Sequence, residues 1–312
     1  MSTHTQTPYF PLVSIVMLSW NRKKDILHSL TQIYNNHYPK FEVIVVDNGS
    51  QDGTGEAIVK NFPDVHLLRL DKNIGIEGYN LGVKKAGGKY LLLLDDDSYP
   101  EAEAIAKMVK LMEKQKNISV VASQIINPTN QLSENKLWPE SVFTFIGCGA
   151  LLKRADWLAV GGYDQHFFLY GNETDIAIRL LNINPENRII YSPDIVCYHS
   201  TAAANRTSGR RAFYQLRNNL WIIWKYFSFF SAWQLSIRRI FEEFIFAFTW
   251  HKSILSFFRG LFSAFGGLGY CLKNRQKISV ILQKKLKASS TSLFGEPIFV
   301  FIINNFKKRY KK

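Results

Sequence analysis

The chain has 312 residues, enough for one large domain or two small ones, and 46% of them are hydrophobic, which excludes a disordered protein. Its three cysteines are far apart, which indicates a reducing compartment and no disulfide framework. The net charge of +14 is unevenly distributed. Residues 1–200 hold 19 Lys/Arg and 22 Asp/Glu, whereas residues 201–312 hold 20 Lys/Arg and three Asp/Glu.

Short apolar, β-branched runs alternate with segments whose apolar residues recur at helical spacing. Strands are expected at 12–19, 41–47, 65–71, 89–97 and 118–126. Helices are expected between the first two strands, at 78–86, at 101–114 and after Asn172. The alternation predicts an α/β fold with an open, mostly parallel sheet and helices on both faces. Ligands of such sheets bind at the carboxyl ends of the strands.

Three adjacent carboxylates, Asp95, Asp96 and Asp97, follow the buried-type run "KYLLLL". A hard divalent cation that bridges the charged oxygens of a nucleoside diphosphate needs oxygen ligands, usually one or two carboxylates. A D-x-D pair at a strand end, Asp95 and Asp97, supplies them, and the cation would offset the repulsion. The alternatives are a solvated acidic turn, or Asp97 as the cap of the following helix.

Two polar loops follow other strands. Asp47 ends "VIVVD" and could accept the N3–H of a uracil or thymine or a ribose hydroxyl; it could equally cap a turn. The segment "NIGIEGYNLG" combines glycines, which let backbone approach a ligand closely, with Asn73 and Asn80. It lacks the lysine of a phosphate-binding loop.

Glu173 and Asp175 fall in the first turn of the helix expected after Asn172. Acids there complement the helix dipole, or one of them could act as a general base in a cleft. His199 ends the β-type run "IVCYH", where it is either structural or a third metal ligand.

In order along the chain, these segments resemble family 2 glycosyltransferases with the GT-A fold, in particular the rhamnosyltransferase-like and galactofuranosyltransferase-like branch. The resemblance covers roughly residues 12–230. It rests on the segments "VSIVMLSWNR", "VIVVDNGSQDGT", "NIGIEGYNLG", "LLLLDDDSYPE", "GCGALLKRADWLAVGGYDQHFF", "NETDIAIRL", "YHS" and "FYQLRNNLWIIWKY".

The resemblance implies site residues one by one. Mg²⁺ or Mn²⁺ would be held by Asp95, Asp97 and His199. The nucleotide-sugar donor would be contacted by Asn21, Asp47, Asn73, Gly75, Asn80, Asp95, Asp96 and Arg217. The family's base motif commonly reads E-D-x-D, whereas this chain has Asn172-Glu173-Thr174-Asp175, so either Glu173 or Asp175 would be the base.

The implied activity is inverting transfer of a hexosyl or deoxyhexosyl group from a dTDP-, UDP- or GDP-sugar to a hydroxyl of a cell-surface glycan or lipid-linked acceptor. A nucleotidyltransferase would carry a glycine-rich basic loop near its start, and "MLSWNRKKD" has no glycine. A non-catalytic sugar- or nucleic-acid-binding protein is the alternative from another class, although no nucleic-acid-binding motif is present.

The expected domains are an N-terminal extension at 1–11, a catalytic GT-A domain at 12–210 and a helical basic region at 211–312. That last region holds 24 of the 44 aromatic residues, which fits an anionic membrane surface. Segment 253–272 has the length of a membrane span, but Arg259 and four glycines make it a poor helix. Because the start of the chain lacks the pattern of a signal peptide, we expect a cytoplasmic protein bound peripherally to the membrane.

Overall fold

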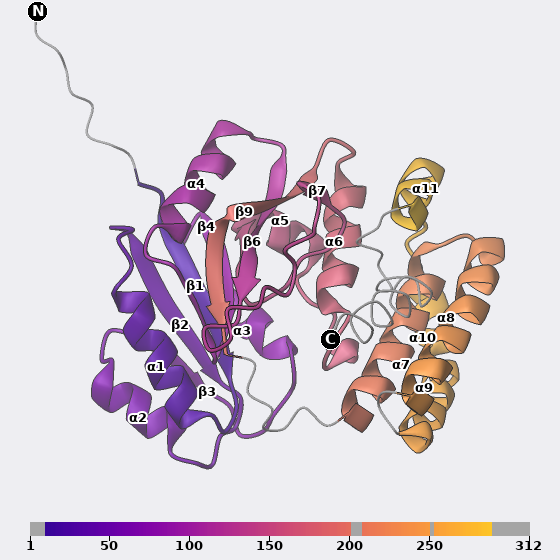
Figure 1. Cartoon of the computed structure of the whole chain (residues 1–312), viewed down its shortest axis with the longest axis horizontal. Coiled ribbons are helices and arrows are strands. Elements are labelled where there is room, and N and C mark those ends of the chain that lie inside the picture. Colours follow the sequence, from indigo (N-terminus) through magenta and orange to yellow (C-terminus); the bar gives the residue numbers. More distant parts are fainter. Residues whose placement is uncertain (1–9, 201–207, 250–252, 289–312) are drawn as a thin grey trace, which may run out of the picture. The chain divides into compact units, whose positions relative to one another are not determined.

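The computed structural model describes residues 10–200, 208–249 and 253–288 (Figure 1). The chain forms two compact units. The sheet unit comprises Met1–Ser141, Phe145–Tyr163 and Glu186–Thr201, and the helical unit comprises Val142–Thr144, Asp164–Pro185 and Ala202–Lys312. This division differs from the expected domain at 12–210, because residues 164–185 pack with the C-terminal helices.

The elements follow the expected alternation. The strands are β1 (Val13–Ser19), β2 (Phe41–Asp47), β3 (His66–Arg69), β4 (Tyr90–Asp95), β5 (Ser98–Pro100), β6 (Ile118–Ile126), β7 (Ser141–Val142), β8 (Ala150–Lys153) and β9 (Arg188–His199). The helices of the sheet unit are α1 (Lys23–Tyr34), α2 (Thr54–Asn61), α3 (Glu77–Lys85), α4 (Ala104–Lys114) and α5 (Arg154–Val160).

The sheet has the strand order β3-β2-β1-β4-β8-β6-β9-β5. Strands β3, β2, β1 and β4 run parallel, as do β6 and β9, whereas β8 is antiparallel to both of its neighbours. The sequence analysis expected an open, mostly parallel sheet in an α/β fold, and this expectation is confirmed.

Helices cover both faces of the sheet. On one face α1, α2 and α4 bury apolar residues such as Ile26, Ile58 and Met108 against the odd-numbered positions of β1. On the other face α3 lies so close that a Cβ at Gly82 would stand 2.6 Å from Val16. Strands covered on both sides must be apolar throughout, which explains the four-leucine run of β4.

The strand register gathers the polar positions at one edge of the sheet. Ser19 pairs with Asp47 and Leu18 pairs with Asp95, so the ends of β1, β2 and β4 coincide. Strand β5 leaves the aspartate turn and pairs antiparallel with β9, where Ser98 lies opposite His199. A residue a hundred positions away thereby comes beside the aspartates.

The helical unit contains α6 (Asn172–Ile183), α7 (Ser208–Tyr226), α8 (Phe229–Thr249), α9 (Ile254–Gly266), α10 (Leu268–Lys273) and α11 (Val280–Ala288), with a 3₁₀ turn at Gln165–Phe167. The segment 253–272 was expected to be a poor helix, and it is broken at its glycines, because α9 ends at Gly266 and α10 begins at Leu268. Gly260 nevertheless lies inside α9, where the missing side chain allows close packing: a Cβ there would stand 2.7 Å from the carbonyl oxygen of Phe213 on α7. Among the described residues, no helix is both long and apolar enough to cross a membrane.

Candidate metal and donor site

The turn after β4 is fixed by hydrogen bonds around its aspartates. The Ser98 hydroxyl accepts from the backbone N–H of Asp95 (2.8 Å) and donates to the Asp95 carbonyl (3.1 Å). The phenol of Tyr79 on α3 donates to a carboxylate oxygen of Asp95 (2.9 Å). Asp95 is therefore held in one orientation before any ligand arrives.

His199 faces two of these aspartates. Its Nε2 lies 3.2 Å from Oδ1 of Asp97 and 3.9 Å from Oδ2 of Asp95. Its Nδ1 lies 2.8 Å from Oε1 of Glu134. A carboxylate on one ring nitrogen directs the other nitrogen at a metal, an arrangement common in metal sites. Burial opposes charge on the ring, but the bonds with Asp97, Cys148 and Glu134 outweigh it and raise the pKa of His199 well above its usual value.

These groups fit a hard divalent cation. Ligand atoms that each lie about 2.1 Å from one Mg²⁺ are separated by roughly 3 to 4 Å, which is the separation found between His199 and the two carboxylates. Among the described residues, Asp95, Cys148 and His199 each offer a ligand atom within 4.8 Å of the other two, and Asp97 is not part of that group. Burial raises the pKa of the Cys148 thiol to about 12, and a thiolate suits softer metals than Mg²⁺.

Arg22 explains much of the tolerance for three adjacent carboxylates. Its guanidinium lies 3.0 Å from Asp97 and 3.5 Å from Asp96. Burial raises the pKa of Asp96 to about 8, opposed by Arg22 and reinforced by the neighbouring aspartates. The sequence analysis assigned the compensation to a bound cation alone. The structure adds a fixed arginine and a carboxyl group that keeps its proton near neutral pH.

Four of the eight expected donor residues lie at or just after the ends of β1, β2 and β3. The side-chain oxygen of Asn21 accepts from Gln51 N–H (2.7 Å), and the side-chain oxygen of Asn73 accepts from Gly75 N–H (2.8 Å). Asp47 is 5% exposed and accepts from the backbone N–H of Ser50 (2.9 Å). The Asn48 amide donates to the side-chain oxygen of Asn73 (3.0 Å), so bonds between the loops join all three.

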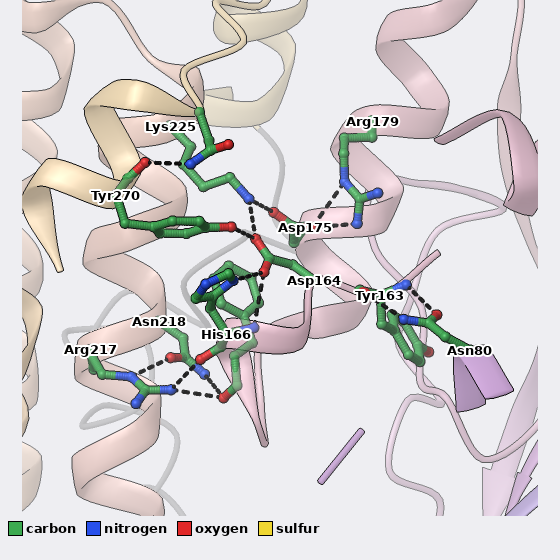
Figure 2. A network of polar contacts seen from close by, with 12 residues as sticks. Asn80, Tyr163, Asp164, His166, Asp175, Arg179, Arg217, Asn218, Lys225 and Tyr270 are labelled. Carbon is green, nitrogen blue, oxygen red and sulfur yellow. Dashed lines mark hydrogen bonds and ion pairs between the residues drawn. The ribbon is translucent and has the colours of Figure 1, made fainter. Parts of the chain in front are cut away.

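Asn80 uses its amide inside the sheet unit. It donates to the Tyr163 carbonyl (2.7 Å) and accepts from the Tyr163 N–H (2.8 Å), as Figure 2 shows. Asp96 is 7% exposed and faces Arg22 and the backbone N–H of Trp20. These internal bonds give both residues a structural role, and their expected donor contacts stay predictions.

In the helical unit the two candidate bases have different surroundings. Asp175 is fully buried, and its carboxylate is bound by Arg179 (2.9 Å), Lys225 (2.9 Å) and the Tyr226 hydroxyl (2.6 Å). Glu173, two residues earlier on α6, is half-buried. A carboxylate that binds three internal donors is poorly placed to accept a substrate proton, so the contacts favour Glu173.

Asp164 extends the ion cluster around Asp175. Lys225 bridges the two carboxylates, lying 2.8 Å from Asp164, which also accepts from Tyr270 (Figure 2). Burial opposes the charge of Asp164, yet Lys225 and Tyr270 outweigh burial and hold the pKa of this carboxyl well below its usual range.

The loop before α6 is strained and held from α7. Phe168 and Tyr170 have positive φ angles of 58° and 62°. Arg217 donates to the carbonyls of His166 (3.1 Å) and Phe167 (2.8 Å), and Asn218 donates to those of Leu169 and Tyr170 (both 2.7 Å). Non-glycine residues in such conformations cluster at functional sites. The same bonds fix the position of Arg217, and its expected donor contact stays a prediction.

Three contributors escaped the sequence analysis. Arg22 lies in the "NR" after β1, within the segment "VSIVMLSWNR", but no role was expected for this arginine. Glu134 lies in an irregular loop with no motif, and Lys225 is one cation among the 20 of residues 201–312. Only the fold brings each of them beside its partners.

Comparison with known proteins identifies the chain's relatives. A curated glucuronosyltransferase of Methanococcus voltae, a dolichyl N-acetyl-alpha-D-glucosaminyl phosphate 3-beta-D-2,3-diacetamido-2,3-dideoxy-beta-D-glucuronosyltransferase, is 25% identical over 191 residues, which are 59% of this chain and 57% of the relative. The chain thus matches just over half of that protein's length.

Two solved structures share the fold. The mannosyltransferase PcManGT of Pyrobaculum calidifontis, in complex with GDP-Man and Mn²⁺, aligns over 84% of this chain and 76% of its own with a TM-score of 0.57 and 20% identity. GalNAc-T7 with UDP, GalNAc and Mn²⁺ aligns over 75% and 51% with a TM-score of 0.61 and 14% identity. These likenesses confirm the expected GT-A fold. The glycosyl transferase family 2 model matches residues 14–177, just over half of the chain, and the chain therefore belongs to this family.

Proposed function

We propose that the chain is a metal-dependent, inverting glycosyltransferase that moves a sugar from a nucleoside diphosphate to a hydroxyl of a cell-surface glycan or lipid-linked acceptor. The observation that carries this proposal is His199, whose Nδ1 bonds to Glu134 while its Nε2 faces Asp95 and Asp97. Mn²⁺ in the complexes of two structural neighbours supports Mg²⁺ or Mn²⁺ as the cation.

Each residue has a defined part in this proposal. Asp95, Asp97 and His199 hold the cation, with Tyr79 orienting Asp95 and Arg22 orienting Asp97. When bound, the cation neutralises the charge of the departing diphosphate. The loops with Asn21, Asp47, Asn73 and Gly75 bind the nucleoside.

Glu173 is the proposed base. It accepts the proton of the acceptor hydroxyl as that oxygen attacks the anomeric carbon in line. The bonds of Asp175 with Arg179, Lys225 and Tyr226 keep the first turn of α6 fixed, so Asp175 is a positioning residue in this scheme.

The proposed location is the cytoplasmic face of a membrane, where a lipid-linked acceptor would be found. Its support is the balance of +17 in residues 201–312. The last part of the basic region expected at the membrane, 289–312, lies outside the described residues.

A panel of dTDP-, UDP- and GDP-sugars tests the activity. With Mg²⁺ or Mn²⁺, one donor should release its nucleoside diphosphate faster than the others, and EDTA should stop the release. No release from any donor, or equal release in EDTA, would contradict the proposal and favour a non-catalytic sugar-binding protein.

A further inference from the structure

Two adjacent helices of the helical unit carry an exposed apolar face. On α8 the exposed residues Phe230, Trp233, Ile237, Phe241, Phe244 and Phe248 recur at steps of three or four residues. On α9 the exposed residues Leu255, Phe258, Phe262 and Phe265 do the same. We call these ten side chains the α8–α9 aromatic face. Steps of three and four place the residues of each set on one side of their helix.

The buried side of each helix is a different one, although Trp233 also contacts Trp224 of α7 and Phe244 also contacts Phe257 of α9. Ser236 of α8 accepts a hydrogen bond from the Trp224 indole of α7 (3.1 Å). On α9 the buried residues are Phe257, Gly260 and Ala264, and the Ala264 carbonyl accepts from the Trp221 indole (3.1 Å). Each helix therefore already has a buried side against α7, and the aromatic face is additional. Soluble proteins rarely expose so many large apolar side chains together without a partner.

The charges around the face have one sign. Residues 208–288 contain two acids, Glu242 and Glu243, and both are buried. Their carboxylates bind Arg238 (2.7 Å) and Arg239 (2.5 Å). The exposed charged residues in the described part of 208–288 are all cations: Arg211, Arg238, Arg259, Lys273, Lys277, Lys284, Lys285 and Lys287.

We propose that the α8–α9 aromatic face inserts into the headgroup layer of an anionic lipid leaflet, which fixes the contact surface for the membrane location of the proposed function. Apolar rings with flanking cations and no exposed carboxylate match such a layer. A second copy of the chain would bring cations against cations. Single-stranded nucleic acid would need cations between the rings to bind its phosphates. All ten positions of the α8–α9 aromatic face are apolar.

Vesicle sedimentation of the full chain tests this surface. The vesicles are phosphatidylcholine alone or phosphatidylcholine mixed with phosphatidylglycerol. The wild type should sediment with the anionic vesicles and be released by high salt. The double variant Trp233→Ser/Phe241→Ser should bind at least about tenfold more weakly, because two of the inserted rings are gone.

A matched control comes from the sheet unit. Leu132→Ser/Leu137→Ser also removes two exposed apolar side chains, the second of them 92% exposed, and should sediment like the wild type. Equal loss in the control, or wild-type sedimentation of Trp233→Ser/Phe241→Ser, would overturn the proposal. So would a wild type that ignores vesicles but forms a dimer that the double variant does not form, or one that retains single-stranded DNA instead.

A second measurement does not depend on the double variant folding. Lipids with brominated acyl chains quench tryptophan fluorescence at short range. The wild type should be quenched in anionic vesicles, and Trp233→Phe, which keeps the face apolar, should lose a measurable part of that quenching. Identical quenching of the two proteins would overturn the insertion of Trp233.

Donor hydrolysis without vesicles separates this inference from the proposed function. All variants should keep wild-type release of nucleoside diphosphate, since none touches the aspartate turn or α6. Vesicle binding without any hydrolysis would leave the surface supported and contradict the glycosyltransferase activity instead.

Discussion

Two groups of carboxylates, one in each unit, differ in how their charge is balanced. In the helical unit Asp164 and Asp175 are matched by Lys225 and Arg179, with Tyr226 and Tyr270 as further donors. In the sheet unit the ion pairs of Asp95, Asp96, Asp97 and Glu134 are with Arg22 and His199. The first group is balanced within the protein, and the second retains an excess of negative charge.

The difference gives a physical criterion for telling a structural group of carboxylates from a functional one. A buried ion pair with complete partners fixes the packing of the elements that carry it. Carboxylates in excess of fixed cations attract one from solution, and their separation decides which cation fits. Sequence alone does not distinguish the groups, because both appear as acids beside apolar runs.

The largest expected effect comes from Asp97→Ala in the unbalanced group. Loss of a metal ligand should lower metal-dependent turnover at least about 10³-fold, because a bound cation supplies several kcal/mol of transition-state stabilisation. The measurement is nucleoside diphosphate release against metal concentration. Asp64→Asn, at an exposed aspartate, is the matched control and should be neutral. Full activity of Asp97→Ala, or of the wild type in EDTA, would contradict the metal role.

Glu173→Gln tests the base in the helical unit. Loss of a general base should lower transfer about 10² to 10⁴-fold. Donor affinity should barely change, because the proposed proton comes from the acceptor. Single-turnover transfer and nucleotide-sugar binding measure the two effects separately. If Glu173→Gln is mild and Asp175→Asn eliminates transfer in a protein of wild-type stability, the assignment is off by two residues.

Asp175→Asn should act mainly on stability. The substitution leaves Arg179 and Lys225 buried with one carboxylate fewer, which should lower the free energy of unfolding by about 3 kcal/mol or more. Urea denaturation followed by circular dichroism measures this loss. Glu56→Gln, which breaks an exposed pair with Arg69, should leave the urea midpoint of unfolding close to that of the wild type. If both substitutions lowered the free energy of unfolding equally, the buried ion cluster would contribute no more to stability than an exposed ion pair.

The sequence predicted the positions of the strands and helices well, but it identified only some of the residues that form the candidate site. Strands β1, β2 and β6 and helices α3 and α6 appear where apolar periodicity places them. Asp95, Asp97 and His199 converge because strand ends in a parallel sheet share one edge. Periodicity does not indicate that α6 packs with the C-terminal helices, because the Asp175–Lys225 pair joins residues 50 positions apart.

Glu134→Gln should weaken metal binding about 10- to 100-fold without removing a ligand. The carboxylate of Glu134 holds the Nδ1 side of His199, and the amide is a weaker partner that can also present its NH₂ group to the ring. Titration with Mn²⁺ followed by electron paramagnetic resonance measures the affinity. Lys136→Gln, two residues along the same loop, is the control. Unchanged affinity in Glu134→Gln would mean that His199 keeps its orientation without this partner.

The smallest expected effect is the pH dependence of metal affinity. His199 must lose a proton to bind a cation, and the pKa of its imidazole is raised by the surrounding carboxylates, so proton and metal compete. As pH rises, the proton is lost more easily and affinity should increase, at most about tenfold per pH unit for one proton. Asp96 acts with the same sign: its carboxyl has a pKa of about 8, so below that pH metal binding displaces its proton, and above that pH it has no proton left to release. Asp96→Asn should therefore make the rise below about pH 8 shallower and leave the slope above that pH unchanged. His199→Ala should bind more weakly at every pH and lose the part of the rise that continues above about pH 8. A wild-type affinity that does not change with pH would show that no proton leaves this site when the metal binds.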